Sequence, residues 1–183
     1  MAEASGGREL LLLRHGIAEE RDPHASAEQE AARPLTALGR RRTREVLDRL
    51  VASGLRADRL LASPLRRARE TAELAIAAGL AGTLELADPL APAGDALPLL
   101  ESLWGPEAMG PAWTRLLLVG HEPDLGRLAA RLLAAPAASL SLKKAGLAWL
   151  ELPPSPAWRT GRLEGSGRLR ALLTPRLVLQ EQR

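Results

Sequence analysis

Short apolar runs alternate with longer stretches of helical character along this chain of 183 residues. Glu9 to Leu13, Arg59 to Ala62 and Arg115 to Val119 are typical of buried strands, although periodicity alone does not distinguish the first of them from a helix. Strands that alternate with helices predict an α/β fold in three layers, with a mostly parallel central sheet and helices on both faces. The polar segment from Ile17 to Pro34 is expected to be a loop.

Capping residues and glycines mark where the helices begin and end. Thr36 is expected to cap one helix, and Ser63 is expected to cap another whose first residue is Pro64. The expected helices run from Thr36 to about Ser53, from Ser63 to near Gly79, onward from Asp95, and from about Asp124 to Ala134.

Strand patterns separated by Pro- and Gly-rich turns dominate the last third of the chain. The expected strands are Leu147 to Leu152, Arg159 to Glu164 and Leu169 to Leu173, with a further short one at Thr83 to Ala87. We expect the later strands to add antiparallel pairs to the sheet. Because no repeat and no interior linker interrupts residues 1–183, they are predicted to form a single domain.

Composition excludes several kinds of site. The chain has no Cys, so it forms neither disulfides nor thiolate metal sites. No second His lies at helical spacing from either of the two candidate histidines described below, and no metal or other cofactor is expected. The formal net charge is only +3, acidic residues are interspersed with basic ones, and Phe and Tyr are absent, so nucleic acid is not an expected partner.

No segment has the length and apolarity of a membrane span. Leu10 to Leu13 is far shorter than the ~18 apolar residues that a transmembrane helix needs. Met1 to Arg8 lacks the basic stretch and apolar core of a secretory signal. We therefore expect a cytoplasmic protein with no membrane partner. Separately, the chain is expected to be a monomer.

Chemically distinctive residues follow three of the predicted strands. They are Arg14-His15-Gly16, Ser63-Pro64 with the helix that contains Arg67, and Gly120-His121-Glu122-Pro123. In open α/β sheets, ligands bind at the carboxyl ends of the strands, so these segments are expected to meet.

Each of these residues also has a plain structural explanation. His15 can be a strand-end histidine bonded to backbone, and Arg67 can lie on a solvated helix face. Taken together, two Arg and two His form a pocket for a phosphate dianion, in which one imidazole acts as nucleophile. Nearby guanidinium groups lower the pKa of that imidazole and keep a nitrogen lone pair free at neutral pH.

The same segments resemble signatures of the histidine phosphatase superfamily, which has the phosphoglycerate-mutase-like fold. Leu13 to Gly16 matches its Arg-His-Gly signature, and Ser63 to Ala72 is similar to its Ser-Pro-Leu-x-Arg-Ala-x-Gln-Thr-Ala segment, with Glu70 in place of the commoner Gln. Gly120 to Pro123 resembles the second-histidine motif of one branch. The likeness extends from about residue 9 to about residue 179.

Within the superfamily, the small phosphohistidine phosphatases of the SixA type are the most similar. Arg33 to Gly39 resembles their Arg-Pro-Leu-Thr segment, and Asp88 to Asp95 resembles their Leu-x-Pro-x-Gly-Asp stretch. The chain also lacks room for the large insertion that covers the site in phosphoglycerate mutases.

The resemblance implies a role for each matching residue. His15 is expected to attack phosphorus and form a phosphohistidine intermediate, with its other ring nitrogen donating to a backbone carbonyl. Arg14, Arg67 and His121 are expected to bind the phosphoryl oxygens. Ser63 is expected to cap its helix, to donate to phosphate, or to do both.

The source of a catalytic proton is not apparent. Glu19, Glu20, Asp22 and Asp95 are each expected to be solvated surface residues, and Glu122 to support the start of the following helix. The lack of a strong catalytic acid is consistent with a phosphohistidine substrate, because the P–N bond is labile and the imidazole leaving group needs less assistance than an alkoxide.

Three functions remain open at this point. The first is a phosphatase for phosphohistidine on a partner protein, such as a histidine-phosphotransfer domain. The second is a phosphatase for small phosphomonoesters on the same scaffold, and the third is a non-catalytic phosphate-binding module. The basic run from Arg40 to Arg44 is either a solvated helix face or a docking surface for an acidic partner.

Overall fold

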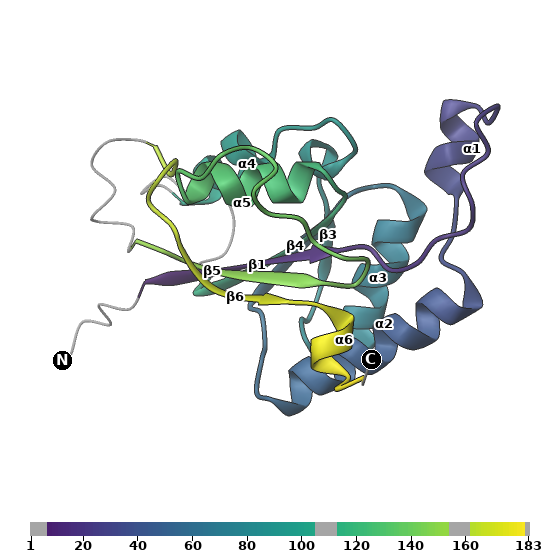
Figure 1. Ribbon diagram of the computed structural model, residues 1–183, viewed down its shortest axis with the longest axis horizontal. Helices are drawn as coiled ribbons and strands as arrows, with labels where there is room; N and C mark the ends of the chain where they lie inside the picture. Colours follow the sequence, from purple (N-terminus) through teal and green to yellow (C-terminus); the bar gives the residue numbers. More distant parts are fainter. Residues whose placement is uncertain (1–6, 105–112, 154–161, 182–183) are drawn as a thin grey trace.

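The computed structural model describes residues 7–104, 113–153 and 162–181 (Figure 1). One six-stranded sheet with the order β3-β2-β4-β1-β5-β6 forms its centre. The strands are β1 (Arg8–Arg14), β2 (Arg59–Ala62), β3 (Leu84–Leu86), β4 (Arg115–Gly120), β5 (Leu147–Leu152) and β6 (Arg168–Leu173). The helices are α1 (Ala27–Ala32), α2 (Ala37–Ala52), α3 (Arg66–Ala77), the 3₁₀ helix η1 (Asp88–Leu90), α4 (Ala96–Trp104), α5 (Asp124–Leu132) and α6 (Pro175–Val178).

The sheet has the predicted mixture of parallel and antiparallel pairs. β1 pairs in parallel with β4, β4 with β2, and β2 with β3. β5 is antiparallel to β1, and β6 is antiparallel to β5. The carboxyl ends of β1, β2, β4 and β6 therefore lie at the same edge of the sheet, which confirms the predicted α/β architecture.

Apolar side chains cover both faces of the sheet because side chains alternate along a strand. Leu10 and Leu12 of β1 pack on the side of α4 and α5. Leu11 and Leu13 pack on the opposite side, with α2 and α3. Figure 1 shows these two helical layers above and below the sheet. The continuous run of leucines in β1 is thus explained by burial on both faces.

The capping signals of α2 work as the sequence predicts. Thr36 is its N-cap, and the Thr36 side chain accepts a hydrogen bond from the Gly39 amide at 2.8 Å. Gly54 follows the helix with a φ of +88°, a left-handed conformation that favours glycine. The predicted helix from Thr36 to about Ser53 is therefore confirmed.

The prediction of a loop from Ile17 to Pro34 is wrong in one part, because it contains α1. Ser26 and Gln29 form a capping box at the start of this helix. None of the residues of α1 is buried, so the helix has no apolar face that a periodicity argument could detect. α1 lies beyond the end of β1, apart from the two main helical layers (Figure 1).

The strand expected from Arg159 to Glu164 is also wrong over its described part. Residues 162–164 form no strand, and the Leu163 amide donates to the Glu101 carboxylate at 3.1 Å. Leu163 is fully buried in the cluster on the α4 and α5 side, which accounts for the apolar signal without a strand. Residues 159–161 lie outside the described residues.

Candidate active site

His15 directly follows β1 and is held at both its backbone and its ring. Its amide donates to the carbonyl of Gly120, at the end of β4, at 3.0 Å. Its Nδ1 lies 2.7 Å from the carbonyl oxygen of Gly16. Because a carbonyl only accepts, Nδ1 carries the ring proton, and Nε2 keeps its lone pair. This contact agrees with the predicted bond from His15 to a backbone carbonyl.

Gly16 allows the chain to pass close to two helices. A Cβ at this position would lie 2.2 Å from Thr43 Oγ1 of α2, so a side chain has no room here. The Gly16 amide donates to Thr71 Oγ1 at 3.1 Å, and that hydroxyl donates to the carbonyl of Arg67 at 2.8 Å. The backbone after His15 is thereby fixed to α3, the helix that carries Arg67.

Arg14 is the last residue of β1, and its guanidinium is half-buried. Nη1 donates to the carbonyl of Leu142 at 2.8 Å, whereas Nε is buried without a hydrogen-bond partner among the described residues. Burial lowers the pKa of Arg14, and the negative charge of Glu122 opposes that shift. Glu122 accepts from the Leu142 amide at 2.9 Å, so it holds the segment before β5 to which Arg14 also bonds.

Arg67 is the second residue of α3 and is almost completely buried. Nη1 donates to the backbone carbonyl of Glu30 at 3.0 Å, and Nη2 lies 3.2 Å from the Glu30 carboxylate. Its Nε is buried without a partner in the described part of the chain. Cations are disfavoured at a helix N-terminus, so the carboxylate of Glu30 compensates an otherwise unfavourable position.

His121 follows β4 and contacts Ser63, which follows β2. Its Nε2 lies 2.8 Å from Ser63 Oγ, and that Oγ accepts from the Leu65 amide at 3.3 Å. The Ser63 hydroxyl hydrogen has no other acceptor among the described residues, so its donation to Nε2 satisfies it and leaves the ring proton of His121 on Nδ1. That buried Nδ1 has no hydrogen-bond partner in the ranges described.

The expected helix start at Ser63 is wrong. α3 begins at Arg66, its N-cap is Leu65, and no side chain caps it. Ser63 is completely buried and its hydroxyl contacts His121. A tertiary contact has thus replaced the local capping bond that the residue type favours.

The two imidazoles are adjacent and both are neutral at pH 7. Their ring centroids lie 5.0 Å apart with an interplanar angle of 55°. Burial lowers the pKa of His15 to about 3, and the charges of Arg67 and Arg14, together with repulsion from His121 when that ring is also protonated, act in the same direction. Burial also lowers the pKa of His121 to about 3, with Arg67 and Arg14 contributing. The structure therefore brings together His15, Arg14, Arg67 and His121, which come from three separate segments of the chain.

Glu30 and Arg33 also belong to this cluster. Arg33 Nε and Nη2 donate to the two carboxylate oxygens of Glu30 at 2.9 and 2.8 Å. The hydrogen bond from Arg33 and the charge of Arg67 hold the pKa of Glu30 below its usual value, so this carboxylate is ionised. The Arg33-Pro34-Leu35-Thr36 motif begins three residues after Glu30 in the chain, but no sequence signal indicated Glu30 itself.

Glu70 connects this motif to α3. Its Oε2 accepts from the Leu35 amide at 2.8 Å, and its Oε1 accepts from Arg66 at 2.9 Å and from Arg40 at 3.1 Å. A carboxylate at this position can accept all three bonds, whereas an amide oxygen would serve fewer of them.

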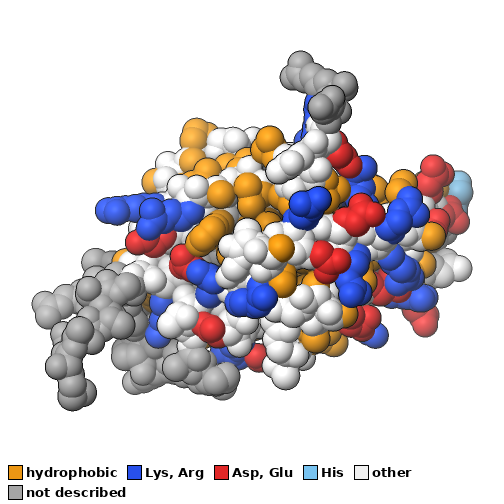
Figure 2. Space-filling view, turned by 90° about the horizontal axis from the view of Figure 1, so that it is seen from below, with side chains coloured by type: hydrophobic (Ala, Val, Ile, Leu, Met, Phe, Trp, Pro, Cys, Tyr) orange, Lys and Arg blue, Asp and Glu red, His pale blue; other side chains and the backbone are white. Residues whose placement is uncertain are grey.

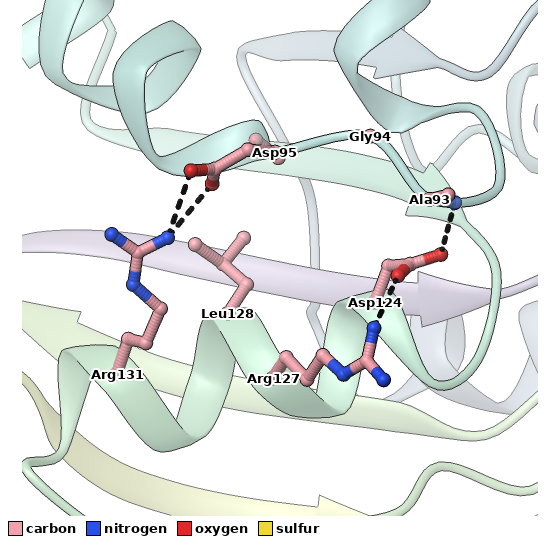
Figure 3. A pocket seen from close by; sticks show the side chains of 8 residues that line it. Ala93, Gly94, Asp95, Asp124, Arg127, Leu128 and Arg131 are labelled. Atoms are coloured by element: carbon pink, nitrogen blue, oxygen red, sulfur yellow. Dashed lines mark hydrogen bonds and ion pairs between the residues drawn. The ribbon is translucent and has the colours of Figure 1, made fainter. Parts of the chain in front are cut away.

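The end of the segment from Asp88 to Asp95, residues 93–95, lines a separate pocket of about 200 Å³ between the start of α4 and α5 (Figure 3). Its charged groups bind one another. Asp95 accepts from Arg131 at 2.9 and 3.0 Å, and Asp124 accepts from Arg127 at 3.4 Å and from the Ala93 amide at 3.0 Å. This motif fixes α4 against α5, and Asp95 is a solvent-exposed surface residue, as expected.

Within residues 7–104, 113–153 and 162–181, no group of three or more His, Asp or Glu side chains is arranged to hold a metal ion. In the same ranges, no helix combines the length and apolarity needed to cross a membrane.

Comparison with known proteins places the chain in a family. Residues 10–90 match the model of the histidine phosphatase superfamily (branch 1). A protein of unassigned function from Picosynechococcus sp. strain PCC 7002 is 42% identical over 140 residues, which cover 76% of this chain and 82% of that protein.

Solved structures share the fold. The protein histidine phosphatase SixA in complex with tungstate superposes with a TM-score of 0.72 at 24% identity, over 91% of this chain and 97% of SixA. A mycobacterial glucosyl-3-phosphoglycerate phosphatase superposes with a TM-score of 0.68 at 19% identity, over 91% of this chain and 99% of the other. From its sequence motifs, family match and fold, the chain belongs to the histidine phosphatase superfamily and is SixA-like in architecture.

Proposed function

We propose that this protein is a phosphatase that removes the phosphoryl group from phosphohistidine on a partner protein, with His15 as nucleophile. The observation that carries the proposal is the cluster of donors around His15. Arg14 Nε, Arg67 Nε and His121 Nδ1 are all buried without a hydrogen-bond partner among the described residues. Buried donors normally have partners, and a phosphoryl group supplies acceptor oxygens for all three.

The geometry of His15 favours attack through Nε2. The bond from Nδ1 to the Gly16 carbonyl fixes the tautomer, and the pKa of about 3 keeps the ring neutral at physiological pH. Nε2 would form a bond to phosphorus while the bond from phosphorus to the substrate imidazole breaks. The leaving imidazole takes a proton from solvent, and water then attacks the phosphoryl group on His15 to release inorganic phosphate.

The surrounding residues would stabilise the charge on the transferring group. Arg14 and Arg67 contribute guanidinium charge, and His121 donates through Nδ1. We propose that Ser63 acts by orienting His121, because its hydroxyl is buried and bonded to His121 Nε2.

Glu30 would have to release Arg67 when substrate binds. Its carboxylate is an anion bound to the same guanidinium that would bind the phosphoryl oxygens. Two anions at one guanidinium repel each other, so the phosphoryl group would replace the Glu30 carboxylate on Arg67 Nη2.

The protein substrate is supported by the likeness to SixA, a protein histidine phosphatase. A second candidate is hydrolysis of small phosphomonoesters, since the mycobacterial relative of the same fold acts on glucosyl-3-phosphoglycerate. Phosphoester cleavage expels an alkoxide, which depends more strongly on a proton donor than an imidazole does.

His15→Ala tests the nucleophile. We expect it to abolish turnover and the acid-labile phosphate label that radiolabelled substrate leaves on the wild-type protein, because no other nitrogen occupies the position of Nε2. His24→Ala is the matched control, since His24 lies exposed in the loop before α1. A label that persists in His15→Ala would show that the nucleophile is a different residue.

A comparison of substrates separates the two candidate activities. The measurement is kcat/KM on a histidine-phosphorylated phosphotransfer domain and on p-nitrophenyl phosphate. Much higher efficiency on the protein is expected. Much higher efficiency on the small ester would favour the phosphomonoesterase. Binding of phosphate without hydrolysis of either substrate would favour a binding module.

A further inference from the structure

A second surface feature lies next to the site, a groove of about 410 Å³ beside α6. Its lining combines four basic side chains with apolar and weakly polar ones. It consists of Ile17, Arg42, Lys143, Lys144, Thr174, Pro175 and Arg176. We call it the basic groove. It contains no Asp or Glu, although the chain as a whole has 22 acidic residues against 25 basic ones.

The two lysines of the basic groove are the only lysines of the chain. Both are exposed, and neither has an ion pair or side-chain hydrogen bond with the described residues. The two arginines of the groove instead bind Glu181 near the C-terminus. Arg42 pairs with its carboxylate, and Arg176 Nε donates to its backbone carbonyl at 3.3 Å. A carboxylate of the chain itself thus already binds one wall of the groove.

The rest of the basic run on α2 is mostly neutralised. Arg40 pairs with Glu70, and Arg44 pairs with Asp48. Figure 2 shows the face on which α2 and α6 lie, with acidic side chains interspersed among the basic ones. Within the run, Arg41 alone has no ion pair among the described residues, and Lys143 and Lys144 add two uncompensated charges at the basic groove.

The basic groove adjoins the catalytic cluster through the backbone. Ile17 immediately follows Gly16, whose carbonyl holds the His15 ring. After Lys144, the Ala145 amide donates to the carbonyls of Arg14 and His15 at 3.1 and 3.2 Å. Thr174 and Pro175 follow β6, which ends at the same edge of the sheet as β1. A protein bound with its phosphohistidine at His15 would reach this groove.

We propose that the basic groove binds an acidic segment of the phosphorylated protein, close to its phosphohistidine. The proposal rests on the proposed function and adds the recognition of the partner. Carboxylates of the partner would pair with Lys143 and Lys144, and apolar side chains would contact Ile17 and Pro175. Leu177 of α6, 65% exposed beside Arg176, extends the apolar contact. The volume suits several side chains, far more than a phosphoryl group.

Charge reversal at the lysines provides the test. The variant is Lys143→Glu with Lys144→Glu, and the matched control is Arg162→Glu with Arg168→Glu, which changes the net charge equally. Arg162 and Arg168 are exposed and lie towards the opposite end of β6. The probes are synthetic phosphohistidine peptides with either acidic or neutral residues around the phosphohistidine, and p-nitrophenyl phosphate.

We expect the lysine variant to lower kcat/KM on the acidic peptide by about tenfold or more, since opposite charges at an interface are replaced by like charges. Its turnover of the neutral peptide and of p-nitrophenyl phosphate should match the wild type. The arginine control should behave as the wild type on all three. Equal losses in both variants, or no preference of the wild type for the acidic peptide, would overturn the proposal.

Binding of an unphosphorylated, fluorescein-labelled acidic peptide separates this proposal from the proposed function. If the protein hydrolyses no phosphohistidine, the proposed function fails. The fluorescence anisotropy of the labelled peptide still shows whether the basic groove binds it. Binding that the lysine variant loses and the arginine control retains supports the basic groove. Equal binding to both variants, or binding of a labelled oligonucleotide in preference to the peptide, contradicts it.

Discussion

His15 and His121 differ in which nitrogen their neighbours leave available. The Gly16 carbonyl occupies Nδ1 of His15, whereas the Ser63 hydroxyl occupies Nε2 of His121. The first ring therefore presents a lone pair and the second presents an N–H donor. These contacts suit two chemically identical side chains to the separate roles proposed for them, nucleophile for His15 and oxyanion donor for His121.

The pH dependence of activity should reflect the lowered pKa of His15. Its protonated form has no free lone pair, and that form appears only near pH 3 rather than at the ordinary 6.5. We expect kcat/KM for p-nitrophenyl phosphate, corrected for the ionisation of the substrate, to show no acid limb near pH 6.5. An acid limb near that value after the correction would contradict a buried, neutral nucleophile.

Glu30→Gln should strengthen the binding of phosphate-like anions. The substitution removes the negative charge that competes for Arg67, while the backbone carbonyl of Glu30 still accepts from Nη1. We expect the inhibition constant of vanadate to fall by about tenfold, or about 1.4 kcal/mol. Glu28→Gln, on an exposed residue of the same helix, is the control. Weaker vanadate inhibition in Glu30→Gln would indicate that the carboxylate positions Arg67 instead of competing for it.

Elements far apart in the chain are joined at the site by single polar side chains. Thr71 fixes α3 to the backbone after β1, and Glu70 fixes α3 to the segment before α2. α1, which has no buried residue, is joined to α3 through the contacts of Glu30 with Arg67. The position of Arg67 therefore depends on hydrogen bonds as well as on the apolar face of α3.

Glu70→Ala should weaken the connection between α3 and the segment before α2. The buried Leu35 amide would lose its acceptor, and we expect a loss of about 1–3 kcal/mol in the free energy of unfolding. Glu70→Gln should lose less, because its amide oxygen can still accept from Leu35. Urea denaturation measures both, with Glu73→Ala on the exposed face of α3 as control. A loss no larger than in the control would show that this carboxylate adds no stability.

The same contact predicts how stability depends on pH. Burial raises the pKa of Glu70, but the bonds from Leu35, Arg66 and Arg40 outweigh burial and hold it below the ordinary 4.5. The contribution of Glu70 is therefore present above pH 4.5 and is lost as the pH falls through its pKa in the folded protein.

Strand β1 lies at the centre of the sheet and carries the site at its end. Its four leucines are fully buried, two against each helical layer. Buried strands hold their backbone rigidly, and catalytic groups at their ends share that rigidity. Strand β6, by contrast, lies at one edge of the sheet, and its first residues are exposed, among them Leu169 at 41%.

Leucine-to-alanine substitutions should reveal this layering. Leu11→Ala and Leu12→Ala, on opposite faces of β1, should each lower the free energy of unfolding by about 2–5 kcal/mol, because each leaves a cavity in a packed layer. Leu169→Ala should change it by about 0.5 kcal/mol or less, as an exposed position. Urea denaturation of the three variants provides the measurement. A small effect at either β1 position would contradict burial on both faces.

Residues whose surroundings are set by neighbours in the chain were predictable. The capping of α2 by Thr36 and the bond from His15 to a backbone carbonyl both involve partners within three residues. Glu30 was not predictable, because α1 is short and has no apolar face, and its contact with Arg67 spans 37 residues. Ser63 was assigned to a local cap, but its hydroxyl contacts His121, 58 residues away.

The amino-acid sequence specified, through local patterns, the strands of the sheet and the reactive side chains that follow them, since burial of a short apolar run and the identity of the next residue are local properties. It also specified two Arg and two His at three strand ends. Packing in three dimensions set which nitrogen of each imidazole is free and how Glu30 binds Arg67. It also placed Lys143 and Lys144, which have no ion pair among the described residues, at the basic groove. Those outcomes depend on contacts between distant segments, and a hydrogen bond goes to whichever partner the packed fold brings within reach.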